Sequence, residues 1–194
     1  MQVKPIPYLT IGLTGGIAGG KSTALQVWKK AGAFVLSCDE LVREISARPI
    51  VRRQLQTWWG RLDKTALAKM IFQQPTQREK LERLIHPLVK KEMTARLKKA
   101  SAPVRVVEVP LLFEAGWENL FDMTVAVIMP EKLRTKCACQ RGLSKSDFVK
   151  RNKAQWPQLK KAAQADVCII NDGSVKELEQ KVCALNNALK KFIL

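Results

Sequence analysis

Long apolar runs are absent from this sequence. Its 194 residues contain no run that approaches the roughly 18 consecutive apolar residues expected of a transmembrane helix. The N-terminal segment leads directly into an expected strand and shows no apolar core of a signal peptide. We therefore expect a cytoplasmic protein without a membrane partner.

Residues that commonly bind transition metals are scarce. His86 is the single histidine, and the five cysteines are an odd number without Cys-x-x-C spacing. The cysteines are Cys38, Cys137, Cys139, Cys168 and Cys183. Two cysteines separated by one residue, with no histidine nearby, make a poor zinc site. We expect reduced thiols rather than disulfides, which again favours the cytoplasm.

Acidic residues are outnumbered two to one. The chain has 34 Lys and Arg against 17 Asp and Glu, which gives a formal charge of +17. This balance favours polyanionic partners such as phosphorylated substrates, nucleic acid or an anionic membrane surface. The basic residues are spread along the chain in pairs, such as Lys90-Lys91 and Lys160-Lys161, at helical positions expected to face solvent. A solvated basic surface is therefore favoured over a specific nucleic-acid site.

One glycine-rich segment carries most of the functional information. It reads G-x-x-x-x-G-K-S and lies between an apolar run that is expected to be a strand and a helical pattern that stops at Gly32. Its residues are Gly15, Gly16, Ile17, Ala18, Gly19, Gly20, Lys21 and Ser22, with Thr23 next. Such a loop wraps backbone N–H groups around phosphate oxygens, while Lys21 reaches the β- and γ-phosphates and Ser22 ligates Mg²⁺. A flexible glycine linker is the alternative, and the flanking strand and helix disfavour it.

The rest of the chain alternates apolar runs with helical patterns. Strands are expected at residues 8–14, 33–37, 104–109, 123–129 and 166–170. Alternation of this kind predicts an α/β protein with a five-stranded parallel sheet covered by helices, which together with the phosphate loop is a P-loop kinase fold. Helix starts are expected at Asp39, Asp63, Thr76, Pro130, Ser144 and Ser174.

Two long helical stretches interrupt the alternation. Residues 39–101 contain no convincing strand and are expected to form a helical insert on the substrate side. Residues 141–165 are helical, basic and broken at Pro157, as expected of a lid that closes over a nucleotide. The nucleotide-binding core is then residues 1–38, 102–140 and 166–194.

Two carboxylates follow expected strands. Asp39 comes after the second strand, where it could meet a substrate hydroxyl or simply cap the next helix. Glu108 ends the third, valine-rich strand, where burial of its charge is costly unless it lies near Mg²⁺ and its water shell or pairs with a cation such as Arg105.

His86 and Arg141 are further candidates. His86, before Pro87 in a helical pattern, could bind phosphate or sugar, or could be a packing residue. Arg141 begins the expected lid and could stabilise the charge on a transferring phosphoryl group, or could be an ordinary surface arginine.

Together these segments resemble the dephospho-coenzyme A kinase family, over about residues 8–183. The matching segments are the phosphate loop, Asp39, Leu84–Val89, Glu108–Glu114, Arg141, Arg151, Gln155, Ala165-Asp166 and Asn171–Gly173. The chain departs from the family pattern in having Ser37-Cys38 before Asp39, Lys64 in place of a common Arg, and Cys137 in place of another.

The resemblance implies a kinase that uses ATP and Mg²⁺ to phosphorylate the ribose 3′-hydroxyl of dephospho-coenzyme A. It assigns catalysis to Asp39, Lys21 and Arg141, with ATP on residues 15–23. It assigns substrate binding to Asp39, His86, Leu111, Leu112 and Glu114, and metal binding to Ser22 and, through water, Glu108. The alternatives are another small-molecule P-loop kinase, for a nucleoside, nucleotide or shikimate, and a nucleic-acid-binding P-loop protein.

Overall fold

The computed structural model describes residues 7–60, 66–67, 70–71 and 74–193. The chain divides into two compact units, one of residues up to Ser37 and from Ala100 onward, the other of Cys38–Lys99. The helical insert was predicted at residues 39–101. The expected helix start at Asp63 and the family departure at Lys64 lie outside the described residues.

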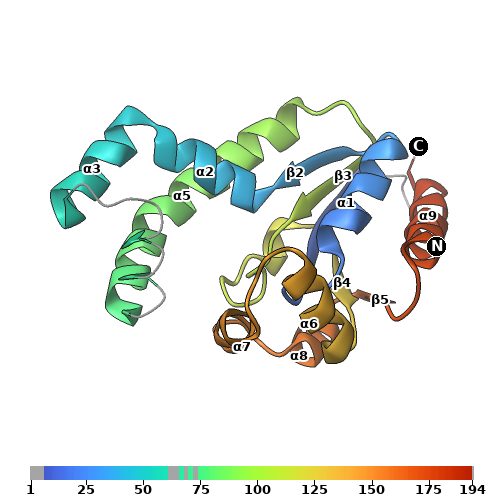
Figure 1. The fold of residues 1–194 in the computed structure, drawn as a ribbon. Helices are drawn as coiled ribbons and strands as arrows, with labels where there is room; N and C mark the ends of the chain where they lie inside the picture. Colours follow the sequence, from blue (N-terminus) through green and yellow to red (C-terminus); the bar gives the residue numbers. More distant parts are fainter. Residues whose placement is uncertain (1–6, 61–65, 68–69, 72–73, 194) are drawn as a thin grey trace. The chain divides into compact units, whose positions relative to one another are not determined.

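The first unit is built on one parallel sheet. Its strands are β1 (Leu9–Gly15), β2 (Phe34–Ser37), β3 (Val104–Glu108), β4 (Met123–Ile128) and β5 (Val167–Ile170). The strand order is β2-β3-β1-β4-β5, and all four neighbouring pairs run parallel (Figure 1). The predicted fold and the five predicted strands are confirmed.

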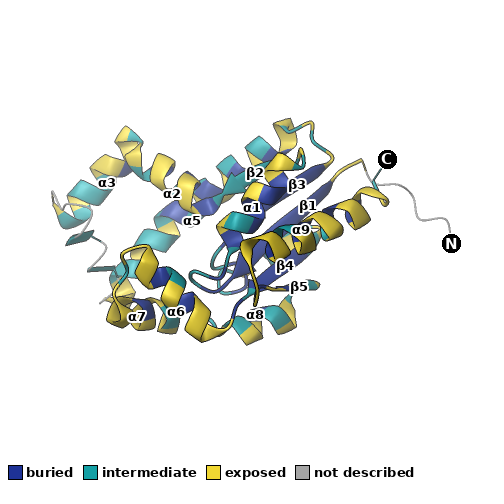
Figure 2. Cartoon of the chain, turned by 45° about the vertical axis from the view of Figure 1, so that its right-hand side comes forward, coloured by how far each residue is buried: buried dark blue, intermediate teal, exposed yellow. Residues whose placement is uncertain are grey.

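Helices cover both faces of this sheet. The helix α1 (Lys21–Lys30) connects β1 to β2, which lies toward one edge of the sheet. The connection from β4 to β5 runs toward the opposite edge and contains α6 (Glu131–Gln140), α7 (Lys145–Lys153) and α8 (Gln158–Gln164). Because right-handed crossovers in opposite directions lie on opposite faces, α1 and α8 flank the sheet. The last helix, α9 (Val175–Lys190), packs beside α1 (Figure 2).

The central strands are buried on both sides, which explains their valine-rich and isoleucine-rich sequences. Ile11, Leu13 and Val106 have no exposed surface, and neither has Trp28, which comes from α1. Each buried aliphatic side chain stabilises the fold by about 1.5–3 kcal/mol. The core therefore fixes the strand ends at which the functional residues lie.

Side-chain caps set two helix starts as predicted. Ser144 Oγ accepts from the backbone N–H of Asp147 at the start of α7, and Ser174 Oγ accepts from that of Glu177 at the start of α9. Pro130 was expected in the first turn of α6; it is instead the N-cap, and the helix begins at the next residue. Pro157 separates α7 from α8, as the predicted break required.

The second unit is helical in its described residues. It contains α2 (Cys38–Ala47), α3 (Pro49–Trp59) and α5 (Pro75–Lys99), and α2 packs against both others. The expected cap at Thr76 is wrong, because α5 already begins at Pro75. The helix also continues through Pro87, since loss of one backbone hydrogen bond does not end a helix of this length.

Two further expectations concern thiols and charge. All five cysteines are free, as predicted. Lys161, expected to face solvent, is instead fully buried. No helix among the described residues is both long and apolar enough to cross a membrane.

Candidate functional site

The phosphate loop is shaped by glycines at two positions. Gly15, at the end of β1, has φ 146°, and a Cβ there would collide with the Val127 carbonyl oxygen. Gly20, the N-cap of α1, has φ 99°, and a Cβ there would collide with Asn171 Nδ2. Both positions exclude other residues, because positive φ and close packing coincide. The sequence therefore needs glycine where the chain leaves the strand and where it enters the helix.

Hydrogen bonds inside the loop hold it closed. Lys21 Nζ, largely buried, donates to the Gly16 carbonyl at 2.9 Å. The Gly19 N–H donates to the same carbonyl, at 3.1 Å, and Asn171 Nδ2 donates to the Gly19 carbonyl, at 3.1 Å. No acidic side chain lies in the first turn of α1, and Gly20 supplies no side-chain cap. The N–H groups of that turn are thus oriented for an anion.

Ser22 and Glu108 lie together beside this loop. Strand register places Glu108 between Leu13 of β1 and Ser37 of β2. Ser22 Oγ donates to Glu108 Oε1 at 3.4 Å, and Glu108 is 7% exposed. Arg105, the alternative partner, is three residues away along the strand and so faces the other side of the sheet. Its guanidinium donates to the carbonyls of Ala100 and Ala102.

Asp39 lies in the first turn of α2 and belongs to the second unit. The helix begins at Cys38, so Asp39 is inside the helix rather than at its cap. Its side chain is exposed and has no hydrogen bond or ion pair with another described residue. The capping interpretation is therefore not supported, and the carboxylate is accessible to a ligand.

Arg141 ends α6 as its C-cap. Its side chain is exposed and has no partner among the residues that the structure describes. An exposed arginine at a helix end has a long, mobile reach. Its role in phosphoryl transfer stays a prediction.

The segment after β3 is tied to α8 by a buried ion pair. Glu114 Oε1 accepts from Lys161 Nζ at 2.8 Å and from the Trp156 N–H at 2.8 Å. Lys161 Nζ also donates to the Pro110 carbonyl. Burial lowers the pKa of Lys161, and Glu114 opposes that change. One oxygen of Glu114 is thus already used inside the protein, whereas its buried Oε2 has no described partner.

The leucines of this segment differ in exposure. Leu112 is fully buried, and Leu111 is half-buried. Leu112 therefore packs in the interior, and Leu111 presents more surface for the substrate role that the resemblance implies.

His86 lies in the middle of α5, in the second unit. It lines a pocket of about 440 Å³ with Glu79, Glu82, Arg83 and Pro87. All of these lining residues belong to α5, so the pocket is an open depression along one helix, and the ligand role of His86 stays a prediction. The presence of two carboxylates makes this pocket less suited to phosphate than the loop of the first unit.

Sequence reasoning missed Arg134. This arginine of α6 is 3% exposed, and its Nη1 would lie 2.7 Å from a Cβ placed on Gly16. The sequence gives only a weak signal, because the spacing of four residues places Arg134 and Ala138 on one helical face. The structure shows that both residues are buried. In a chain with 34 Lys and Arg, the sequence does not distinguish this buried arginine from the exposed basic residues.

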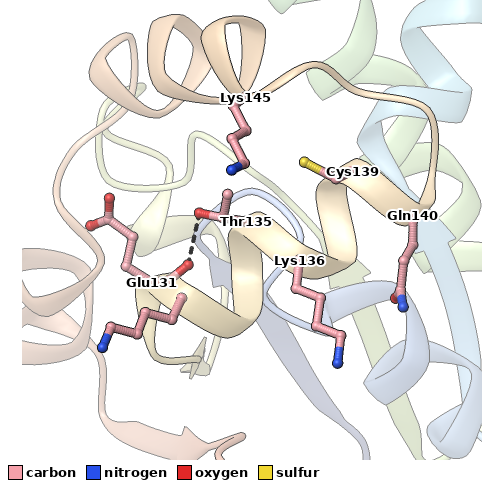
Figure 3. Close-up of a pocket in the computed structure, with 7 residues that line it drawn as sticks. Glu131, Thr135, Lys136, Cys139, Gln140 and Lys145 are labelled. Atoms are coloured by element: carbon pink, nitrogen blue, oxygen red, sulfur yellow. Dashed lines mark hydrogen bonds between the residues drawn. The ribbon is translucent and has the colours of Figure 1, made fainter.

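A larger pocket, of about 760 Å³, lies on the opposite side of α6 (Figure 3). Figure 3 shows Lys145, from the start of α7, pointing toward Thr135 and Cys139 of α6. The other lining residues are Glu131, Lys132, Lys136 and Gln140. None of the predicted site residues lines it, so we locate the candidate site at the phosphate loop.

Several known proteins are similar to this chain in sequence and in fold. A family model described as dephospho-CoA kinase matches residues 9–177. A dephospho-CoA kinase from Enterococcus faecalis is 34% identical over 184 residues, covering 89% of this chain and 92% of the relative. A crystal structure from Thermus thermophilus is 34% identical with a TM-score of 0.83, covering 95% of this chain and 99% of that one. A shikimate kinase from Acinetobacter baumannii, 16% identical with a TM-score of 0.54 and covering 94% and 95%, shares the fold alone. The chain therefore belongs to the dephospho-CoA kinase family.

Proposed function

We propose that this protein transfers the γ-phosphate of ATP to the ribose 3′-hydroxyl of dephospho-coenzyme A, the final step of coenzyme A synthesis. Family membership over most of the chain is the observation that carries the proposal. The phosphate loop, which has the backbone form and the lysine that phosphoryl transfer requires, supports it independently.

Lys21 is the phosphate-binding cation of this proposal. Its Nζ is already directed to the Gly16 carbonyl, inside the loop. A short movement from that carbonyl would let it donate to a phosphate oxygen instead. The ammonium would then offset charge on the β- and γ-phosphates, while loop N–H groups hold them in line.

Ser22 and Glu108 fit a magnesium ion that arrives with ATP. Their oxygens lie 3.4 Å apart, and hard cations prefer oxygen ligands. The described residues hold no cluster of three or more His, Cys, Asp or Glu suited to a metal, so phosphate oxygens and water would complete the coordination. When bound, Mg²⁺ would neutralise negative charge on the phosphates of ATP. Ser22 would hold it directly, and Glu108 through water.

Asp39 is the proposed base or orienting group for the attacking hydroxyl. Its exposed carboxylate has no described partner to compete for the proton. The carboxylate would accept a hydrogen bond from the 3′-hydroxyl and align it with the γ-phosphorus. Arg141 would bring its guanidinium to the transferring group. His86, Leu111 and Glu114 remain the proposed contacts for the rest of the substrate, whereas the fully buried Leu112 would support Leu111 from the interior.

A coupled ADP-release assay tests the substrate. Dephospho-coenzyme A, AMP, a nucleoside and shikimate are compared at equal concentration with Mg-ATP. We expect the highest kcat/KM with dephospho-coenzyme A, and a product that carries the new phosphate on the 3′-oxygen. Faster turnover of AMP or shikimate would show that the shared fold, rather than the proposed reaction, explains the similarity.

A further inference from the structure

Arg134 contacts the phosphate loop from the side of the predicted lid. Its Nη1 is so close to Gly16 that a methyl group on that glycine would meet it at 2.7 Å. Lys21 Nζ donates to the carbonyl of the same glycine, at 2.9 Å. Two cations from different helices, α1 and α6, therefore converge on one residue of the loop.

Both cations are buried. Lys21 is 8% exposed and Arg134 is 3% exposed. A buried guanidinium loses its hydration, which is unfavourable unless an anion compensates its charge. Burial indeed lowers the pKa of Arg134, and only Glu131 opposes this effect.

The protein partners of Arg134 do not neutralise it. Its one side-chain hydrogen bond among the described residues goes to Asn152 Oδ1, an uncharged acceptor on α7, at 2.8 Å. The carboxylate of Glu131 is 4.0 Å away and 69% exposed, so water screens it. The guanidinium also lies 5.6 Å from the Phe148 ring centre. Its buried Nε has no acceptor among the described residues.

We propose that Arg134 binds the phosphate groups beyond the α-phosphate of the nucleotide held by residues 15–23, and that its bond to Asn152 links these phosphates to α7. The inference rests on the proposed function, because it requires ATP in the loop. Arginine suits this position because its planar fork contacts two oxygens at once while a further N–H keeps Asn152. Arg134 is then a nucleotide-binding residue in addition to Lys21 and Arg141.

A displacement titration separates this role from general damage to the site. A fluorescent ATP analogue, bound with Mg²⁺, is displaced by ATP, ADP and AMP from the wild type, Arg134→Lys and Lys132→Gln. We expect Arg134→Lys to weaken ATP and ADP by about tenfold, because a point charge replaces a bidentate contact, and AMP by less than about threefold. Lys132→Gln removes one charge from the exposed face of the same helix and should change all three by less than about twofold.

Two outcomes would overturn the inference. One is ATP affinity of Arg134→Lys close to wild type, and the other is an equal loss for ATP and AMP. Failure of the wild type to bind Mg-ATP would contradict the proposed function instead.

A second variant tests the structural alternative. Arg134→Met keeps the volume of the stem and removes the charge. If the guanidinium serves a ligand, the melting temperature without nucleotide should stay within about 2 °C of wild type or rise, since the buried charge is gone. The ATP-induced increase in melting temperature should fall by at least half. A lower melting temperature with the ATP-induced increase preserved would make Arg134 a packing residue only.

Discussion

Asp39 is exposed in the first turn of α2, directly after β2. We predict that Asp39→Asn folds normally and binds ATP as the wild type does, because the side chain is exposed without a described partner and the loop is untouched. Its kcat should fall by at least about 10²-fold, since an amide neither accepts the hydroxyl proton nor aligns the hydroxyl as well. Steady-state kinetics and thermal melting measure the two effects.

The neighbouring Glu40 is the matched control for Asp39. It is also exposed, and its ion pair with Arg43, at 3.7 Å, is accessible to solvent. Glu40→Gln should therefore keep near-normal turnover. Equal kcat values for Asp39→Asn and Glu40→Gln would show that Asp39 is not the catalytic carboxylate, and Glu108 would be the next candidate.

Arg141 makes a separate prediction. Its guanidinium is exposed and without a described partner, so Arg141→Ala should leave the melting temperature unchanged. If Arg141 meets the transferring phosphoryl group, kcat should fall by about 10²-fold or more, with a smaller change in ATP affinity. Lys136→Ala, an exposed cation on the same helix, is the control. Similar kcat values for the two variants would show that Arg141 is an ordinary surface residue without a catalytic role.

Residues within local motifs could be predicted from the sequence, and residues defined by tertiary contacts could not. Lys21 and Ser22 belong to a pattern of fixed spacing, so their place in the phosphate loop could be predicted from eight consecutive residues. Lys161 and Arg134 are buried only because α8 and α6 pack against the post-β3 segment and the phosphate loop. In a chain with 34 basic residues, nothing local distinguishes these two from solvated neighbours.

The same distinction holds for the elements. The strands were predictable because burial on both faces requires continuous apolar runs. Helix limits were less certain, because they depend on single residues. The serine caps at Ser144 and Ser174 gave correct starts, whereas Pro75 moved the start of α5 ahead of Thr76. Pro87 also failed to interrupt that helix.

The pairing of β4 with β5 depends in part on Asp166, immediately before β5. Its Oδ2 accepts from the Thr124 hydroxyl and from the Thr124 N–H, each at 2.7 Å. These bonds, the hydroxyl first, lower the pKa of Asp166 below its usual 3.8. The folded state therefore binds this proton less tightly than the unfolded state does. The resulting stabilisation is present above about pH 3.8 and is lost as the pH falls through the folded-state pKa.

We predict that Asp166→Asn is slightly less stable than the wild type at pH 7, by less than about 1 kcal/mol because the carboxylate is exposed. Asparagine can accept the same two bonds but carries no charge. The difference in free energy of unfolding should shrink as the pH falls below about 3.8 and vanish at lower pH. Denaturant titrations at several pH values measure it. A difference that is constant with pH would mean that the charge does not contribute.

At the scale of the whole molecule, the charge is the feature that the proposed reaction leaves least explained. The formal charge is +17, yet parts of it are used internally, as in the buried pair of Lys161 with Glu114. Arg96 likewise lies between Glu44 and Glu92 in the second unit. Most other lysines of the described residues are exposed on helices. Two of them, Lys80 and Lys160, lie over the rings of Trp58 and Trp156, in different units of the chain.

A solvated basic surface and a nucleic-acid site make different predictions about salt. If the surface is only solvated, duplex and single-stranded DNA should bind weakly, without sequence preference, through phosphate contacts alone. The logarithm of the binding constant should then fall steeply and linearly with the logarithm of salt concentration, and binding should disappear near physiological salt. Fluorescence anisotropy with two unrelated sequences at several salt concentrations measures both properties. Mg-ATP binding serves as the internal control, because in the proposed function it depends on the largely buried Lys21 of the phosphate loop, whose charge salt screens less. Tight DNA binding that persists at high salt, or a preference between the sequences, would restore nucleic acid as a partner.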